Sequence, residues 1–182
     1  MIEILDDVWR AIKRLIVQPR KCLHTGANGG VMILTAFVAW KCLMLLTNCA
    51  SPVVVVLSGS MEPGMYRGDI LFLRNPGTYH TGDVVVYNLK GRDIPIVHRV
   101  LSVHQRDDGN QMLLTKGDNN NVDDRGLYNR GQMWLTEDDI YGTAYAYAPS
   151  LGMATIWINE WQGAKQLLIL AMVIAAMMGK EI

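Results

Sequence analysis

The residues that could carry chemistry begin with a serine at a tight bend, in Ser58-Gly59-Ser60-Met61-Glu62-Pro63. The apolar residues 53–57 precede it with the β-branched content of a buried strand. We expect Gly59 to adopt a backbone conformation that other residues avoid, so that the chain turns and Ser60 protrudes. A protruding serine can act as a nucleophile where a base takes its proton. An ordinary Ser/Gly/Pro turn has the same composition, so these six residues alone do not decide the function.

A serine nucleophile needs a base, and the histidines are the first candidates. His98 lies within residues 94–101, where a strand would hold its ring, and we expect it to be the base, although any single histidine can also be an ordinary core residue. An imidazole with an ordinary pKa of about 6.5 can take a proton at neutral pH. Lys116 is the rival base, because a buried amine can do the same work. The remaining histidines precede the apolar segment, lie in a loop or end a strand beside a charged hairpin: His24, His80 and His104.

Acidic and amide side chains are concentrated in residues 116–126. An aspartate from this segment could orient the base, but an Asx-rich turn that satisfies its own backbone is an equally simple reading. A calcium loop starting at Asp118 fails, because its sixth and twelfth positions are Asp123 and Asn129 instead of Gly and Glu. Because the sequence has no metal-ligand spacing elsewhere, we expect neither a metal nor a cofactor.

Six apolar runs separated by turn signals predict an all-β domain that would position these side chains. The runs are 52–57, 69–74, 83–88, 96–104, 111–116 and 140–147. Residues 107–110 have the composition of a hairpin loop between the fourth and fifth runs.

Residues 29–50 are long and apolar enough, with their flanks, to span a bilayer. Basic residues are frequent in residues 1–28, whereas only Arg67 occurs in the 20 residues after residue 50. The positive-inside rule therefore predicts a cytosolic N-terminus, with everything after residue 50 across the membrane. The basic segment is too long for a secretory leader, so we expect an uncleaved anchor. Before Pro19, apolar residues recur at helical spacing and predict an amphipathic helix on a membrane surface or a partner.

Near the C-terminus, Trp157 and Trp161 precede the apolar run 167–178. Tryptophans beside an apolar run suit a membrane interface, but the run is short for an ordinary span. We expect a short interfacial or thin-membrane helix, with a core helix of the β-domain as the alternative.

The overall composition excludes some classes of protein. A net charge of +0 gives no basic field for nucleic acid. The cysteines all lie within the first 50 residues, so no disulfide framework is expected in the β-domain: Cys22, Cys42 and Cys49.

Together these segments resemble the signal peptidase I family, most closely its endoplasmic-reticulum branch, which supplies catalytic subunits of the signal peptidase complex. Four sequence boxes in order, behind an anchor, carry the resemblance: 58–63 with 67–69, 82–87, 94–100, and 115–120 through 122–128.

The resemblance implies a mainly β, signal-peptidase-like peptidase domain with an N-terminal transmembrane helix and a short C-terminal apolar helix. We expect four segments: a cytosolic amphipathic segment 1–28, a transmembrane anchor 29–50, a lumenal β-rich serine peptidase domain 51–164 and a membrane-associated helix 165–182.

The resemblance also assigns the site. It implies Ser60 as nucleophile, His98 as base where bacterial members have lysine, and Asp124 as the third member, with Asp118 also important in a less settled role. The Ser60 backbone N–H and the Ser58 hydroxyl would hold the oxyanion.

The implied activity is that of a membrane-anchored serine endopeptidase. It would remove signal peptides from secretory and membrane pre-proteins during translocation into the endoplasmic reticulum, cutting after small residues by a Ser-His-Asp acyl-enzyme mechanism. Its partners would be signal peptides, accessory subunits of the complex and membrane lipid, with no nucleic acid. It would cross the endoplasmic-reticulum membrane once, with a lumenal catalytic domain. The alternative is a non-catalytic, membrane-anchored subunit that binds peptides in a translocation or processing complex.

Overall fold

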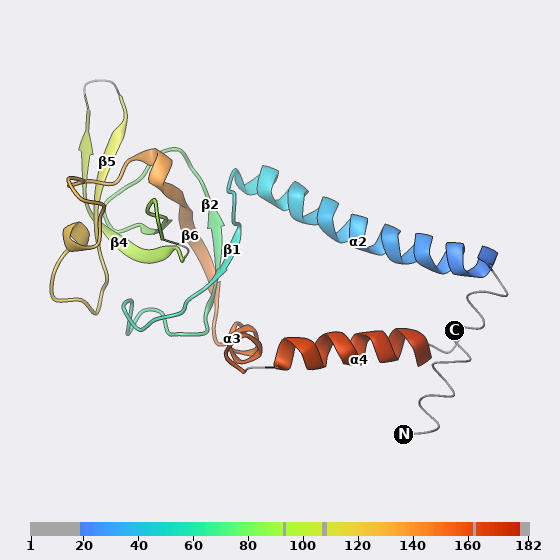
Figure 1. Cartoon of the computed structure of the whole chain (residues 1–182). Helices are drawn as coiled ribbons and strands as arrows, with labels where there is room; N and C mark the ends of the chain where they lie inside the picture. Colours follow the sequence, from blue (N-terminus) through green and yellow to red (C-terminus); the bar gives the residue numbers. More distant parts are fainter. Residues whose placement is uncertain (1–18, 93, 107–108, 162, 179–182) are drawn as a thin grey trace. The chain divides into compact units, whose positions relative to one another are not determined.

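The computed structural model describes residues 19–178 except 93, 107–108 and 162 (Figure 1). The chain divides into two units. One is Lys41–Ile156, and the other combines Met1–Trp40 with Trp157–Ile182. The amphipathic helix expected in residues 1–18 lies outside the described residues.

The unit Lys41–Ile156 is built on one six-stranded sheet with the order β1-β2-β6-β3-β4-β5, and its strand pairs are antiparallel. Each of the six predicted runs forms a strand, and the expectation of a mainly β domain is confirmed. The strands are β1 (Val53–Val55), β2 (Ile70–Arg74), β3 (Val84–Tyr87), β4 (Ile96–Gln105), β5 (Gln111–Lys116) and β6 (Ile140–Ala148).

Both faces of the sheet are covered, as the central strand β3 shows. All four of its residues are buried. Val85 and Tyr87 belong to one hydrophobic cluster, and Val86 belongs to the other. Because alternate residues of a strand point to opposite faces, the two clusters lie on opposite sides of β3. This explains why β3 is a continuous apolar run instead of an alternating one.

Register shifts interrupt three of the strand pairs, between β2 and β6, β3 and β6, and β4 and β5. Such irregularities bend a strand and increase its twist. β4 and β5 pair from Arg99 with Lys116 to Gln105 with Gln111, so they form the hairpin that the sequence predicts. The first two residues of its loop are outside the described part of the chain.

The helix α2 (Pro19–Thr47) contains the N-terminal apolar segment and starts upstream of the expected residue 29. Its part Gly26–Thr47 has a mean hydropathy of 1.9 and is long and apolar enough to cross a membrane. None of that part is buried within the protein. A helix that is apolar and exposed along its length suits a lipid environment.

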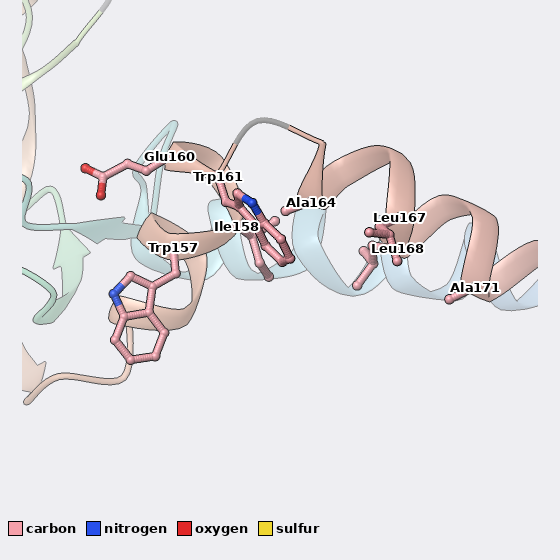
Figure 2. Close-up of a pocket in the computed structure, with 8 residues that line it drawn as sticks. All are labelled: Trp157, Ile158, Glu160, Trp161, Ala164, Leu167, Leu168 and Ala171. Atoms are coloured by element: carbon pink, nitrogen blue, oxygen red, sulfur yellow. The ribbon is translucent and has the colours of Figure 1, made fainter.

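The C-terminal helices are α3 (Met153–Glu160) and α4 (Ala164–Met178). Trp157, Trp161 and Leu167 are each more than half exposed. Figure 2 shows that both indole groups, together with Leu167 and Leu168, line an open apolar hollow on this segment. The short apolar C-terminal helix expected from the sequence is therefore present, with its apolar side chains exposed and outside a core.

Candidate active site

The turn after β1 presents two serine hydroxyls next to each other. Oγ of Ser58 and Oγ of Ser60 are 3.2 Å apart, with Ser58 exposed and Ser60 half-buried. The expectation for Gly59 was wrong, because its backbone is not in the left-handed region. A Cβ at this position would lie 2.8 Å from Oε1 of Glu62, so a larger residue would require the flexible Glu62 carboxylate to shift.

The loop 117–120 braces the backbone of the serine turn. The Asn119 N–H donates to the Ser60 carbonyl at 2.9 Å, and its side-chain amide donates to the Gly59 carbonyl at 3.1 Å. A Cβ on Gly117 would lie 2.7 Å from that same Ser60 carbonyl. Within the described residues the Ser60 N–H donates to no partner. The turn is therefore fixed through its carbonyls, and one N–H beside the serine hydroxyl stays available.

His98, in β4, is paired with Asp124 in the short 3-10 helix η1 (Asp124–Gly126). His98 Nδ1 and Asp124 Oδ2 are 2.6 Å apart. The residues are 3% and 1% exposed, so bulk water barely competes for this contact. Of the three aspartates that the sequence left open, Asp124 contacts the imidazole. Asp123 instead accepts the Arg125 N–H at the start of η1.

Two hydroxyl groups also contact Oδ2 of Asp124. The Tyr87 hydroxyl donates to it at 3.1 Å and the Thr115 hydroxyl at 2.6 Å. The Tyr128 hydroxyl lies 2.9 Å from the Thr115 hydroxyl. Oδ1 of Asp124 is buried and has no partner among the described residues. Nothing in the local sequence pattern marks these three hydroxyl residues as part of the site, although each lies in one of the four boxes that carry the family resemblance.

Burial raises the pKa of both tyrosines, and the charge of Asp124 raises it further. Both phenols therefore keep their protons at neutral pH. Tyr87 is consequently a permanent hydrogen-bond donor to the carboxylate.

Asp118 does not reach the ring nitrogens of His98. Its two carboxylate oxygens accept hydrogen bonds from Nε and Nη2 of Arg99, at 2.8 Å and 2.7 Å. Arg99 also donates from Nη1 to the Gly82 carbonyl at 2.8 Å. The hydrogen bonds from Arg99 hold the pKa of the Asp118 carboxyl below its usual value, against the opposing effect of burial. Asp118 thus forms an ion pair with Arg99, the residue that follows the candidate base His98.

The sheet register separates Lys116 from His98. Lys116 pairs with Arg99 across β4 and β5, so these two side chains lie on the same face. His98 is the neighbour of Arg99 along the strand and points to the opposite face. This register disfavours Lys116 as the base.

A cleft of about 380 Å³ contains both Ser60 and His98. No hydrogen bond joins these two residues in the described part of the chain, and only Nδ1 of the imidazole is bonded. Contacts between a catalytic base and its nucleophile often tighten only when substrate binds. The cleft is mostly apolar and is lined by Val54, Val55, Val56, Leu57, Ser58, Ser60, Arg92, Ile94, Pro95, Ile96, Val97, His98, Asn120 and Leu127.

The chemistry available in this cleft is acid–base and nucleophilic. No group of three or more His, Cys, Asp or Glu side chains in the described residues could hold a metal ion. A serine, an imidazole oriented by a buried carboxylate, and a free backbone N–H are the parts that acyl transfer requires.

Comparisons with known proteins agree on a peptidase. Residues 28–135 match the family model described as Peptidase S24-like. The chain is 54% identical to "Signal peptidase complex catalytic subunit SEC11" of Plasmodium falciparum (isolate 3D7), over 97% of this chain and 100% of that protein. It is 45% identical to the human catalytic subunit SEC11C over 91% of this chain and 86% of that protein. Identity to the Dictyostelium discoideum subunit is 44%, over 85% and 87% of the two chains.

Proposed function

Because the chain belongs to the Peptidase S24-like family, and within it to the signal peptidase complex catalytic subunits, we propose that it removes signal peptides from pre-proteins. The enzyme would be a membrane-anchored serine endopeptidase of the endoplasmic reticulum. The observation that carries this proposal is the 2.6 Å contact of His98 with Asp124, at a cleft that also contains Ser60.

In the proposed mechanism, the Ser60 hydroxyl attacks the scissile carbonyl while Nε2 of His98 takes its proton. The contact of Nδ1 with Asp124 supports this direction, because a donated Nδ1–H leaves the Nε2 lone pair on the side of the cleft. His98 then gives the proton to the leaving amine, and an ester to Ser60 remains. Water, deprotonated by the same imidazole, cleaves the ester and restores the serine.

We propose that the oxyanion is held by the Ser60 N–H and the Ser58 hydroxyl. The unpaired state of this N–H within the described residues, and the short distance between the two hydroxyls, support these roles. Donors aimed at the developing negative charge stabilise the transition state more than the substrate.

The substrate would be an extended peptide with small residues near the cut. In the sheet order β1 is an edge strand, and its residues line the cleft together with residues 94–97. An exposed strand edge can pair with an extended peptide, while apolar side chains select small residues. The proposed partners are therefore signal peptides, together with the other subunits of a signal peptidase complex.

The test is cleavage of a pre-protein by the full chain in its purified complex. Ser60→Ala and His98→Ala are each expected to lower kcat by at least 10³-fold, because both act in one proton-transfer step. Both variants should accumulate in the membrane at normal levels. Matched controls are Ser102→Ala and His104→Ala, both in β4 and outside the cleft, which should keep near-normal activity. Full activity of Ser60→Ala would contradict the proposed mechanism.

A further inference from the structure

The hydroxyl groups beneath the catalytic pair form a chain whose hydrogen-bond directions can be worked out. Three groups converge on one oxygen, Oδ2 of Asp124: Nδ1 of His98, the Tyr87 hydroxyl and the Thr115 hydroxyl. A carboxylate only accepts hydrogen bonds, so the single hydroxyl hydrogen of Thr115 points at Asp124.

Because the Thr115 hydroxyl donates to Asp124, it also determines whether the Tyr128 hydroxyl donates or accepts. The Tyr128 hydroxyl accepts the backbone N–H of Thr115 at 3.0 Å. It also lies 2.9 Å from the Thr115 hydroxyl, whose hydrogen is already used on Asp124. Tyr128 must therefore donate to Thr115. The hydrogen bonds therefore run in one order. The Thr115 backbone N–H donates to the Tyr128 hydroxyl, the Tyr128 hydroxyl donates to the Thr115 hydroxyl, and the Thr115 hydroxyl donates to Asp124.

These hydrogen-bond directions determine which nitrogen of the His98 imidazole carries the proton. The hydroxyl hydrogens of Tyr87 and Thr115 both point at Oδ2 of Asp124, so this oxygen is an acceptor, and its contact with Nδ1 of His98 needs a hydrogen from the imidazole. This forces Nδ1 to carry the proton and leaves Nε2 as the base. Thr115 and Tyr87 do not line the cleft, so they influence the reaction only through Asp124 and His98.

We propose that Thr115 and Tyr87, supported by Tyr128, are positioning residues that hold Asp124 as an oriented carboxylate and thereby set the tautomer of His98. This inference rests on the proposed serine-peptidase function. The titratable groups that contact the pair or its hydroxyl partners are the two tyrosines, from β3 and from the segment after η1. Two further charged groups act on His98: Asp118, which is paired with Arg99 and interacts electrostatically with the imidazole, and Arg92, which lines the same cleft.

The test uses the full chain in its purified complex and measures kcat, KM and the pH profile of pre-protein cleavage. Thr115→Val and Tyr87→Phe are each expected to lower kcat about tenfold, a part of the 10²–10⁴-fold that a positioned general base contributes. KM should stay within about twofold, because neither side chain lines the cleft. Thr115→Ser keeps the hydroxyl and should restore most of kcat.

The pH profile separates this role from a merely structural one. A carboxylate that accepts fewer hydrogen bonds holds an imidazolium partner more strongly. The acid limb of kcat/KM should therefore move to higher pH in Thr115→Val and Tyr87→Phe. Matched controls are Thr143→Val, which removes a buried hydroxyl that has no partner among the described residues, and Tyr79→Phe, which removes a buried hydroxyl bonded to Asn75. Neither control should shift the limb.

Three outcomes decide between the proposals. An active Ser60→Ala complex would overturn the proposed function itself. If Ser60→Ala is inactive but Thr115→Val and Tyr87→Phe retain normal kcat and an unshifted profile, the positioning inference is wrong and the function stands. Equal losses in Thr115→Val and Thr115→Ser would also overturn the positioning inference, because packing would then be the cause. If Thr115→Val does not accumulate, the profile of Tyr87→Phe decides.

Discussion

Asp118 and Asp124 both follow strand β5 and both carry a carboxylate, but their surroundings differ and so do the roles that we assign to them. Asp124 is almost fully buried, accepts the imidazole and two hydroxyls on one oxygen, and belongs to the proposed reaction. Asp118 is partly exposed and forms a two-point ion pair with Arg99. We therefore interpret Asp118, which the sequence grouped with the catalytic residues, as a link between the loop that braces Ser60 and the strand that carries His98.

The Asp118–Arg99 pair should make stability depend on pH. Because Arg99 lowers the pKa of Asp118 in the folded protein, the pair contributes fully above the ordinary carboxyl pKa of about 3.9, and this contribution is lost as pH falls from there through the lower pKa of the folded state. Asp118→Asn should destabilise the protein by about 1 kcal/mol near pH 7, after allowance for solvent screening. Melting temperatures of the purified complex from pH 3 to 7 test this. A difference between wild type and variant that does not shrink at low pH would contradict it.

Ser58 provides a second test at the residue scale. As an oxyanion donor it should act mainly in the transition state, so Ser58→Ala is expected to lower kcat roughly 10²-fold with little change in KM. Ser58→Thr, which keeps a hydroxyl, should retain more activity than the alanine variant. A Ser58→Ala loss that appears in KM alone would instead assign this residue to substrate binding.

At the scale of elements, local pattern was enough to predict the strands but not the contacts between them. Strand β3 and the β4–β5 hairpin follow from apolar runs and turn residues. The bend and the strand made Ser60 and His98 candidates, and the family resemblance implied their roles and that of Asp124. The choice of Asp124 over Asp118, and the contribution of Thr115, depend on sheet register and on where η1 lies against β5. Those are long-range facts that no single segment encodes.

The loop 117–120 yields a prediction at this scale. Gly117→Ala would place a Cβ 2.7 Å from the Ser60 carbonyl, a backbone atom that cannot move without shifting the nucleophile. A displacement of about 1 Å at a reacting group can cost 10²-fold, so kcat should fall by about that factor. Gly126→Ala is the matched control, because nothing lies within 4 Å of a Cβ there. Normal kcat in Gly117→Ala would show that the loop does not fix the turn.

At the scale of the whole molecule, an apolar helix precedes the peptidase unit and another follows it. The part Gly26–Thr47 of α2 could cross a membrane, and α4 exposes apolar side chains such as Leu167. Basic residues before the span favour a cytosolic N-terminus and a lumenal cleft.

This topology can be tested by glycosylation, since the sequence has no Asn-x-Ser/Thr acceptor of its own. The exposed pair Thr78→Asn with His80→Thr creates one in the peptidase unit. In endoplasmic-reticulum microsomes this variant should gain an endoglycosidase-sensitive glycan, because acceptors are modified only in the lumen. The same acceptor fused before Met1 should remain unmodified. The reverse pattern would invert the proposed orientation.

The sheet order separates Ser60 from the other two members of the proposed catalytic set, which come from the neighbouring strands β4 and β5 and the segment after β5. Ser60 follows the edge strand β1, His98 lies in β4, and Asp124 lies in η1 after β5, while β2, β6 and β3 stand between β1 and β4. Contacts between such distant segments form only after the intervening chain has closed, which makes them late events in folding. We therefore expect the proposed catalytic set to assemble only once the sheet has formed. On the proposed function, a newly made chain would become an active peptidase only after this unit has folded.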